Sequence, residues 1–573
     1  MKIALIQFKS ALAEPIKNAK RHLEFILKAK DQGADLIVFP EMSLFSYPLY
    51  DLPEDKNIIT EQNLALDFIL KNLPDSVSVL VGGLLQNTEK GKSFFNSAFL
   101  LSKSEKIKIF SKKLIPNYDI FDEHRFIQPS DKNFDNSVFS IKSKSFLLHI
   151  CEDSWFGIDS LSNRHLHYVS EDFFKAKGNV DYVINMSASP FFQGKKNNRL
   201  NMAKNLTSNF DAHLLYVNLV GASDEVIFDG RSFVYSKNNK LLSEAKAFKE
   251  DILIVDTESK DLNSEVSGET NSKVILKDSH LNITRKALCF GLSEFIKQSG
   301  FKKIHIGLSG GVDSAVIACL ATEALGSKNV QALSLPSQFS SQLSFDLASE
   351  QAKLLNISLK NISIQKMFQT CKQEIDLELN ISSQSVIHEN IQARLRSLVL
   401  MSYSQKEKSL LLNTSNKSEI AVGYSTLYGD LSGAICPIGD LLKTEVYALA
   451  EYYCKTGKIS QSIIDRPPTA ELKKDQLDKD SLPNYEILDF IIIKILNIKN
   501  SMILDEKFNP SFGDYIKNIY TKSELESVEK FCKTKILESE FKRFQAPPIL
   551  KVSIKSFGQG RKMPVANYNL QIK

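Results

Sequence analysis

Short apolar runs, rich in β-branched and aliphatic residues and separated by polar turns, recur through residues 1–260. Such runs are typical of buried strands. Arg21–Lys30 instead places apolar residues at helical spacing, which predicts a helix that covers one face of a sheet. This pattern predicts an α/β or α+β domain. The predicted strands are Lys2–Phe8, Leu36–Phe39, Val77–Gly82, Phe146–Ile150, Tyr182–Met186 and Leu214–Asn218.

The polar stretch Asp256–Ser279 interrupts this pattern, and its Ser, Asn, Asp and Glu residues are typical of a linker. After it, a strand–helix–strand rhythm predicts a doubly wound parallel sheet. We expect one domain over 1–258, a linker over 259–279 and a second domain over 280–573. The elements expected in the second domain are Leu281–Gln298, Lys303–Leu308, Ala315–Leu325, Val330–Leu335, Phe345–Leu355 and Ile357–Ile362.

Length and charge narrow the class of protein. A chain of 573 residues exceeds what one hydrophobic core usually serves, so at least two domains are expected. The 72 Lys and Arg residues nearly balance the 67 Asp and Glu residues, which argues against a dedicated nucleic-acid-binding protein. No window approaches the roughly 18 uninterrupted apolar residues of a membrane span, and the N-terminus lacks a secretory signal. Seven cysteines without C-x-x-C spacing fit a reducing compartment, so we expect a cytoplasmic protein without membrane or nucleic-acid partners.

The segment Ser309–Ser314 (SGGVDS) lies between a predicted strand and a predicted helix. A glycine-rich turn at a helix N-terminus directs backbone N–H groups and the helix dipole toward an anion such as a phosphate. Glycine turns with a serine cap also occur without a ligand in many α/β proteins. The carboxylate of Asp313 inside such a turn is explained if it faces a Mg²⁺ ion bound to phosphates. The segment therefore predicts a site for a nucleotide and Mg²⁺.

SGGVDS resembles the SGGxDS signature of the ATP pyrophosphatases, which adenylate a substrate and release pyrophosphate. The resemblance to NAD synthetases extends over nearly all of residues 280–573, and it implies that ATP converts the carboxylate of deamido-NAD to an acyl-adenylate, which ammonia attacks. A carboxylate needs this activation because oxide is a poor leaving group, and Mg²⁺ with cationic side chains offsets charge on the pyrophosphate. The segments that carry the resemblance are Glu389–Arg394, Asn413–Glu419, Ala421–Asp430, Arg466–Leu472 and Asp480–Pro483.

The same resemblance implies roles for individual residues. Mg²⁺ would be held by Asp313 and Glu419. Singly, charged residues such as Lys443 and Arg394 are more often solvated surface groups, so the assignment depends on the whole set. The residues implied for ATP are Gly307, Leu308, Ser309, Gly310, Gly311, Val312, Asp313, Ser314 and Thr414. Those implied for deamido-NAD are Asn390, Glu419, Asp430, Lys443 and Lys542.

A carboxylate, an amine and a thiol each follow a predicted strand in the first half: Glu41, Lys112 and Cys151. Side chains placed just after buried strands can converge at one edge of a sheet. A thiol attacks a carboxamide only as the thiolate, so it needs a base, which Glu41 would supply. Lys112 would stabilise the oxyanion of the tetrahedral intermediate, and Lys113 is the alternative to it.

Each of these residues has an ordinary structural explanation: an inert buried cysteine, a helix-capping glutamate or a solvated lysine. Together the three segments resemble the Glu-Lys-Cys nitrilase superfamily of carbon–nitrogen hydrolases across roughly residues 1–260. The stretch Lys112–Phe126 is similar to the version fused to NAD synthetases. By this resemblance glutamine would be held by Tyr118, Phe121, Glu152, Ser189 and Lys195, with Tyr47 as a weaker candidate.

The two resemblances imply an αββα nitrilase-like sandwich followed by a doubly wound domain of the adenine nucleotide alpha hydrolase type. They also imply a homo-oligomer that uses glutamine, ATP and deamido-NAD and forms NAD, glutamate, AMP and pyrophosphate. One alternative keeps this architecture but amidates a different carboxylate or nucleotide. Another is a non-catalytic nucleotide sensor. The presence of every residue that the chemistry requires argues against it: Glu41, Lys112, Cys151, Asp313 and Glu419.

Overall fold

The computed structural model describes residues 1–156, 179–259, 279–383, 385–473, 476–498 and 512–566. The chain divides into two compact units, Met1–Ser223 with Ile227–Lys277 and Asp224–Val226 with Asp278–Lys573. The linker expected over 259–279 lies almost entirely outside the described residues.

Two six-stranded sheets form the centre of the first unit. The first sheet has the order β14-β1-β2-β3-β4-β5 and the second has the order β13-β12-β9-β8-β7-β6. In the first sheet the strands are β1 (Lys2–Gln7), β2 (Leu36–Val38), β3 (Ser78–Gln86), β4 (Phe94–Leu101), β5 (Lys108–Ser111) and β14 (Asp251–Asp256). In the second they are β6 (Val138–Ile141), β7 (Lys144–Ile150), β8 (Tyr182–Ser187), β9 (His213–Asn218), β12 (Phe233–Tyr235) and β13 (Leu241–Glu244). A separate hairpin pairs β10 (Val220–Ser223) with β11 (Val226–Asp229).

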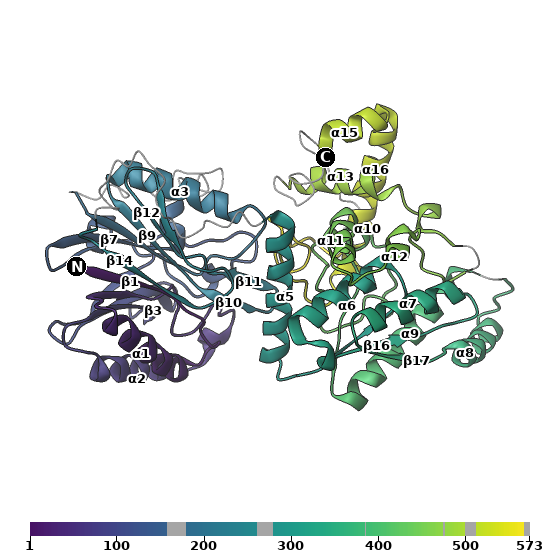
Figure 1. The fold of residues 1–573 in the computed structure, drawn as a ribbon, viewed down its shortest axis with the longest axis horizontal. Helices are drawn as coiled ribbons and strands as arrows, with labels where there is room; N and C mark the ends of the chain where they lie inside the picture. Colours follow the sequence, from purple (N-terminus) through teal and green to yellow (C-terminus); the bar gives the residue numbers. More distant parts are fainter. Residues whose placement is uncertain (157–178, 260–278, 384, 474–475, 499–511, 567–573) are drawn as a thin grey trace. The chain divides into compact units, whose positions relative to one another are not determined.

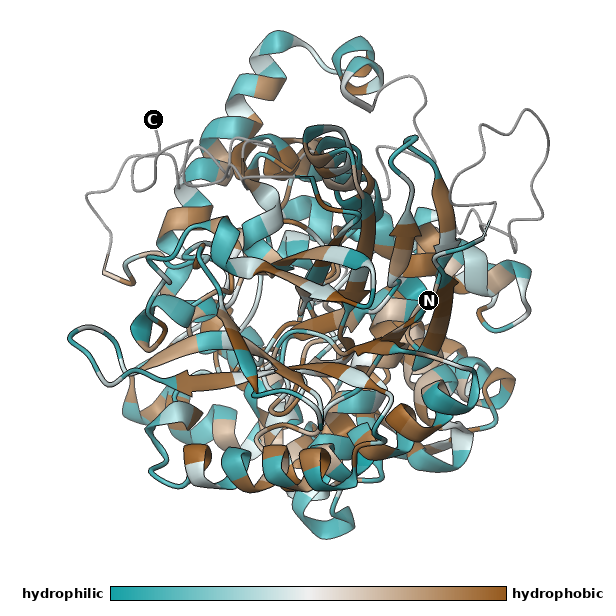
Figure 2. Cartoon of the chain, turned by 90° about the vertical axis from the view of Figure 1, so that its left-hand side faces the viewer, coloured by the Kyte–Doolittle hydropathy of each residue, from teal (hydrophilic) through white to brown (hydrophobic). Residues whose placement is uncertain are grey.

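The two sheets pack face to face and helices cover their outer faces. Residues from both sheets share one buried core, including Leu5 and Val38 from the first and Leu148 and Ile184 from the second. Helices α1 (Pro15–Asp31) and α2 (Ile58–Asn72) lie on one side, and α3 (Lys195–Phe210) lies on the other (Figure 1). The strands near the N-terminus are mainly hydrophobic in Figure 2, as expected for strands buried between layers. The expected αββα sandwich is confirmed.

A four-stranded parallel sheet organises the second unit, with the order β17-β16-β15-β18. Its strands are β15 (Ile304–Gly307), β16 (Val330–Ser334), β17 (Ser358–Asn361) and β18 (Leu410–Leu411). The chain moves outward from β15 to β17 and then returns past β15 to form β18. This reversal is the doubly wound topology predicted from the alternating pattern, and it creates a switch point between β15 and β18 where ligands bind in such folds.

Helices surround this sheet and continue beyond it toward the C-terminus. α6 and α7 contact the β15–β17 side, whereas α9 contacts β15 and β18. A second apolar core joins α10, α13 and α16. The helices of this unit are α5 (His280–Gln298), α6 (Val312–Leu325), α7 (Gln342–Leu354), α8 (Gln365–Glu378), α9 (Val386–Glu407), α10 (Lys417–Val422), α11 (Lys443–Lys455), α12 (Gln461–Asp465), α13 (Tyr485–Leu496), α15 (Phe512–Ile519), α16 (Lys522–Glu538) and α17 (Glu540–Arg543).

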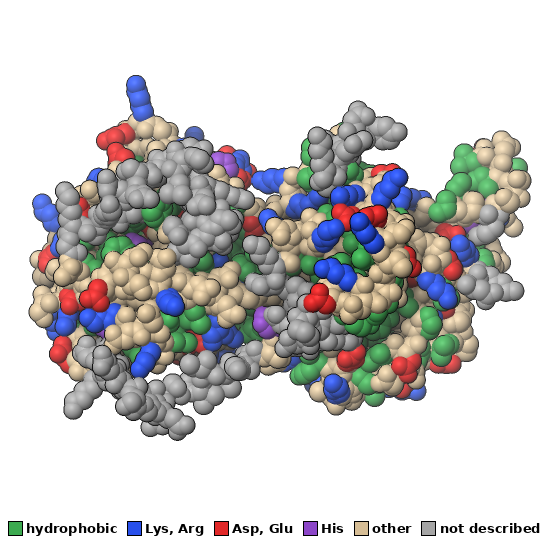
Figure 3. Space-filling view, turned by 90° about the horizontal axis from the view of Figure 1, so that it is seen from above, with side chains coloured by type: hydrophobic (Ala, Val, Ile, Leu, Met, Phe, Trp, Pro, Cys, Tyr) green, Lys and Arg blue, Asp and Glu red, His purple; other side chains and the backbone are tan. Residues whose placement is uncertain are grey.

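The surface agrees with the charge balance of the sequence. On the face shown in Figure 3, Lys and Arg side chains are interspersed with Asp and Glu side chains. Among the described helices, none combines the length and the apolar composition that a membrane crossing requires.

Candidate active sites

Cys151 directly follows β7 and begins a short 3₁₀ turn, Cys151–Trp155. Its backbone has a φ of 48°, a left-handed conformation that residues other than glycine rarely adopt, so the chain turns sharply at the strand end. Only 5% of the residue is exposed. Burial raises the pKa of the Cys151 thiol well above its usual range, and Glu41 raises it further although Lys112 opposes both. The thiol is therefore protonated at rest and needs a base when it attacks.

The Lys112 ammonium lies between two buried carboxylates. Its Nζ is 2.8 Å from Glu41 Oε1 and 2.8 Å from Glu123 Oε1. Burial opposes the charge on Lys112, but the two carboxylates outweigh it and hold the pKa of the ammonium well above its usual range. Lys112 is therefore a permanent cation beside the carboxylate that the sequence predicts as the base.

Three strands hold Glu41 in place. Its Oε2 accepts the backbone N–H of Ala188 at 2.7 Å, just past β8, and its Oε1 accepts the side-chain amide of Asn96 on β4 at 2.8 Å. Gly82 on β3 lies against the same segment, because a Cβ there would be 2.4 Å from the backbone nitrogen of Met42. The glycine thus allows the Glu41 segment to pass close to the sheet.

Two residues of this cluster were not predicted from the sequence. Glu123 lies within Lys112–Phe126 but was not predicted as a site residue, because it follows no predicted strand. Asn96 lies in β4, an element that was not predicted. The two candidate lysines have different partners: Lys112 contacts both carboxylates, whereas Lys113 Nζ donates to Ser137 Oγ at 2.6 Å and lies over the Phe134 ring.

The structure describes all five residues that the resemblance implies for glutamine. Tyr118 donates its hydroxyl to Glu152 Oε2 at 2.9 Å, and its ring contacts that of Phe121. Ser189 follows β8, where its backbone N–H donates to Asn218 at 2.8 Å. Lys195 begins α3, and its ammonium lies 4.6 Å from the centre of the Trp155 ring. Burial, followed by the nearby Arg199, lowers the pKa of Lys195 to about 8.

In the second unit, the SGGVDS segment connects β15 to α6, as predicted, and Gly310 has a φ of 77°. A Cβ on Gly310 would lie 2.5 Å from the backbone oxygen of Ser344, so only glycine fits there. Ser314 on the first turn of α6 accepts the backbone N–H of Ser309 at 3.3 Å. The loop and the segment Asn413–Ser415 flank the switch point of the sheet, from β15 and β18 respectively.

Asp313 and Glu419 lie on either side of one ammonium group. Lys443 Nζ is 2.5 Å from Asp313 Oδ2 and 3.2 Å from Glu419 Oε1, and Asn416 donates to Asp313 Oδ1 at 2.9 Å. Burial raises the pKa of the Glu419 carboxyl to about 7 even though Lys443 opposes this shift. The same two carboxylates outweigh burial and raise the pKa of Lys443. The structure therefore brings together three residues that are far apart in the sequence.

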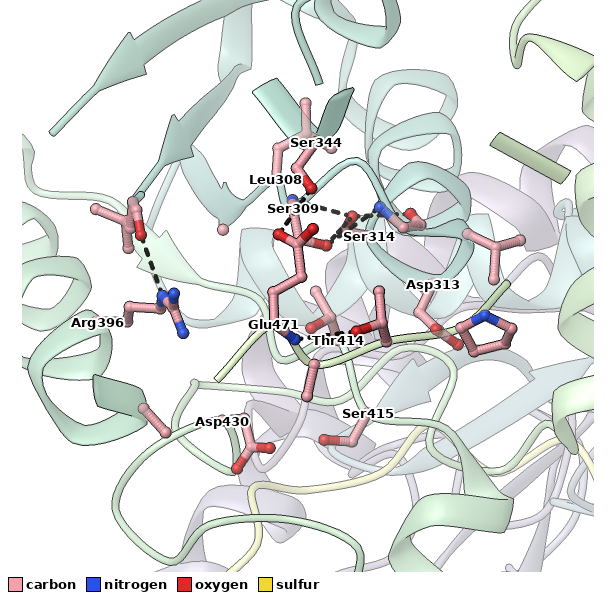
Figure 4. Close-up of a pocket in the computed structure, with 18 of the residues that line it drawn as sticks. Leu308, Ser309, Asp313, Ser314, Ser344, Arg396, Thr414, Ser415, Asp430 and Glu471 are labelled. Carbon is pink, nitrogen blue, oxygen red and sulfur yellow. Dashed lines mark hydrogen bonds between the residues drawn. The ribbon is translucent and has the colours of Figure 1, made fainter. Parts of the chain in front are cut away.

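A cavity of about 320 Å³ opens over the loop (Figure 4). Most of the residues implied for ATP and deamido-NAD line it: Gly307, Leu308, Ser309, Gly311, Val312, Asp313, Ser314, Thr414, Glu419, Asp430 and Lys443. Asp430 lies across the cavity from Ser309 and Ser314. Arg396 and Glu471 also line it and were not predicted as site residues.

Asn390 and Lys542, also implied for deamido-NAD, do not line this cavity in the described part of the chain. Asn390 accepts the Thr426 hydroxyl at 2.8 Å, and Lys542 donates to the backbone oxygens of Gly423 and Ser425. Both therefore hold the segment 423–426, which adjoins Asp430.

Comparison with known proteins identifies both halves. Residues 2–264 match the carbon–nitrogen hydrolase family and residues 284–528 match the NAD synthase family. The glutamine-dependent NAD(+) synthetase of Synechocystis sp. is 34% identical over 98% of this chain and 98% of its own length. The chain belongs to the glutamine-dependent NAD(+) synthetases. It is accordingly a ligase, with a nitrilase-like domain and an NAD synthetase domain.

Solved structures agree with this assignment. The glutamine-dependent NAD+ synthetase from Acinetobacter baumannii, in complex with adenosine diphosphate, is 29% identical with a TM-score of 0.72, covering 100% of this chain and 99% of that one. The enzyme from Cytophaga hutchinsonii shares the fold, with a TM-score of 0.78 at 18% identity over 99% of this chain and 97% of that one. The relatives do not favour the alternative in which the chain amidates a different acceptor.

Proposed function

We propose that the chain releases ammonia from glutamine at Cys151 and uses it, with ATP, to amidate deamido-NAD. The observation that carries the proposal is that one chain holds both the buried Cys151 site with its Glu41–Lys112 pair and the nucleotide loop with its Asp313–Lys443–Glu419 cluster. Each site supplies what the other lacks, because the first yields ammonia and the second activates a carboxylate to receive it.

Glutamine hydrolysis follows from the charges around Cys151. Glu41 takes the thiol proton as sulfur attacks the carboxamide carbon, and the Lys112 ammonium stabilises the oxyanion that forms. The C–N bond then breaks, the proton passes from Glu41 to the leaving nitrogen, and ammonia departs from a thioester. Water, deprotonated by Glu41, hydrolyses the thioester and releases glutamate. Glu123, bonded to the other side of Lys112, keeps the ammonium charged and fixed in direction.

The residues around Cys151 are suited to a substrate with both a positive and a negative group. Lys195 offers a cation and Glu152, paired with Tyr118, offers an anion. Glutamine carries an α-carboxylate and an α-ammonium group at the end opposite its amide. We assign Lys195 to the carboxylate and Glu152 to the ammonium, with Phe121 packing against the aliphatic part and Ser189 completing the pocket.

The second site fits a divalent cation. Asp313 and Glu419 direct their carboxylates at the same point, which Lys443 occupies in this structure. Among the described residues, no group of three or more His, Cys, Asp or Glu side chains could hold a metal by itself. Mg²⁺ commonly binds one or two carboxylates and completes its shell with phosphate oxygens and water. Asp313 and Glu419 would hold it, where it would neutralise charge on the phosphates of ATP.

Adenylation uses the loop and the cations around it. Backbone N–H groups at the start of α6 bind the phosphates, and the deamido-NAD carboxylate attacks the α-phosphorus as pyrophosphate leaves toward the loop. Ammonia then attacks the acyl-adenylate carbon, giving the amide of NAD and releasing AMP. Lys443 is placed to stabilise negative charge during both steps. Asp430 lies on the opposite side of the cavity from the loop (Figure 4).

Labelled glutamine tests the proposal directly. Glutamine carrying ¹⁵N on its amide is supplied with ATP, Mg²⁺ and deamido-NAD, and the product is analysed by mass spectrometry. We expect ¹⁵N in the carboxamide of NAD, together with AMP and pyrophosphate. Nicotinate, aspartate and xanthosine nucleotides are tested as acceptors in parallel, and failure to turn over deamido-NAD would refute the proposal.

The Cys151→Ala variant separates the two sites. It removes the nucleophile without altering the second unit, so glutamine use should disappear while added ammonium still supports NAD formation. Loss of both activities would contradict the proposal that glutamine hydrolysis and NAD formation take place at separate sites.

A further inference from the structure

Asp153, two residues after the nucleophile, is fully buried and accepts three backbone N–H groups. Its Oδ1 accepts those of Lys113 at 3.0 Å and Leu114 at 2.9 Å, and its Oδ2 accepts that of Ile150 at 3.0 Å. Only 2% of the residue is exposed. A carboxylate that accepts several N–H groups in a buried place makes strong, directional hydrogen bonds.

These three N–H groups belong to two separate segments of the active site. Lys113 and Leu114 directly follow Lys112, whereas Ile150 directly precedes Cys151. One carboxylate therefore holds the backbone that carries the ammonium at a fixed distance from the backbone that carries the thiol. Asp153 does not bond the backbone of Lys112 itself, whose N–H donates to the backbone oxygen of Asn96 and whose oxygen accepts the N–H of Ser130.

The position of this backbone matters because it sets where the side chain of Lys112 ends. Its ammonium stands at the end of a four-carbon stem and must meet both Glu41 and Glu123 at 2.8 Å. A small displacement of the backbone at Lys113 therefore moves the ammonium away from the place where the oxyanion forms. Misplacement by about 1 Å can reduce a rate roughly 100-fold.

We propose that Asp153 is a positioning residue that aligns the Lys112 ammonium with the Cys151 thiol. It does not touch glutamine or exchange a proton, and it acts through the backbone of its neighbours. The inference rests on the proposed glutaminase function of Cys151, and it predicts that glutamine hydrolysis depends on Asp153 while the synthetase reaction does not.

The test uses the full chain with Asp153→Asn. Asparagine has nearly the same shape, but one of its two terminal groups is a donor, so it cannot accept from both segments. We expect the kcat for glutamine-dependent NAD formation to fall roughly 100-fold with KM for glutamine changing little. Ammonium-dependent NAD formation should keep its wild-type rate, which also shows that the second unit is folded.

A matched control lies at the other end of the same strand. Asp181 accepts the backbone N–H and the hydroxyl of Ser145 at the start of β7, whereas Asp153 accepts the backbone N–H of Ile150 at its end. Asp181→Asn should leave both activities unchanged. An equal loss in this control would overturn the proposal, because the effect would then belong to the strand and not to the alignment of Lys112 with Cys151.

A chemical readout distinguishes alignment from loss of structure. Alkylation of Cys151 by iodoacetamide is followed by peptide mass spectrometry as a function of pH. We expect its midpoint to move to higher pH in Asp153→Glu, which keeps the negative charge near Cys151, because the thiolate loses part of the stabilisation from Lys112. An unchanged profile together with wild-type kcat would overturn the proposal, as would an equal loss of ammonium-dependent activity.

If Asp153→Asn does not accumulate as a soluble protein, Asp153→Glu replaces it. Glutamate keeps the charge but moves the carboxylate by one methylene, so the same loss of kcat is expected, and wild-type kcat would overturn the proposal. The Cys151→Ala variant is measured beside both. If it still uses glutamine, the proposed glutaminase function fails; if it behaves as expected while the Asp153 variants resemble wild type, only the present inference fails.

Discussion

Replacing Lys112 with methionine tests the assignment of the cation in the amidase site. Methionine keeps the length and apolar volume of the stem but removes the ammonium that lies 2.8 Å from both Glu41 and Glu123. At an effective dielectric constant of about 20, each of these contacts corresponds to an attraction of roughly 6 kcal/mol before desolvation. Without the cation, two buried carboxylates face each other, and one of them must take a proton.

The expected loss of activity follows from two effects. Removing one group that stabilises an oxyanion reduces kcat by roughly 100- to 1,000-fold. A proton on Glu41 would in addition remove the base. We therefore expect glutamine-dependent NAD formation to fall by at least about 1,000-fold, which corresponds to about 4 kcal/mol in activation free energy.

The neighbouring residue supplies the control. Lys113→Met removes an ammonium that bonds Ser137 and lies over Phe134, so glutamine-dependent activity should fall less than about tenfold, through local stability alone. Both variants are assayed with glutamine and with ammonium, and the ammonium reaction should persist in each. The reverse ranking, with Lys113→Met inactive on glutamine and Lys112→Met active, would refute the reasoning.

Three further outcomes are expected. Gly310→Ala places a Cβ against the Ser344 oxygen and strains a left-handed residue, so KM for ATP should rise at least about tenfold while glutamine hydrolysis is unchanged in a glutaminase assay. Because the pKa of Lys195 is about 8, its charge is lost as pH rises from 7 to 9, so KM for glutamine should rise over that range, and Lys195→Arg should flatten the rise. Lys443→Met leaves Asp313 and Glu419 without their shared cation, so calorimetric titration without nucleotide should show roughly tenfold tighter Mn²⁺ binding.

The strands that escaped the sequence analysis show how function alters a pattern. β4 places the polar residues Asn96 and Ser97 inside a buried strand, and both are about 1% exposed. The side-chain amide of Asn96 donates to Glu41, so this polar group has a partner inside the buried strand. A periodicity argument treats such a residue as a break in the strand, so a strand with buried polar site residues is easily missed.

Glu123 illustrates a different difficulty. Its position after Lys112 in the chain suggested no contact, because the residues between them form an irregular loop whose path depends on tertiary packing. Burial raises the pKa of this carboxyl, and Lys112 and Asn96 oppose the shift. A carboxylate of this kind becomes recognisable only when its partners are known in space.

The sequence by itself determined many of the buried strands and helices, the two halves and the identities of the principal reactive groups Glu41, Lys112, Cys151, Asp313 and Glu419. Apolar periodicity is a local property, and short motifs such as Ser309–Ser314 specify a turn and a helix start within a few residues. The tertiary structure alone decided the particular hydrogen bonds and ion pairs that these charged groups make. Lys443 joins Asp313 to Glu419, and Asp153 joins the segment after Lys112 to Cys151, across sequence separations that carry no local signal. The physical reason is that burial makes each unpaired charge costly, so partners are selected by the packing of the whole unit.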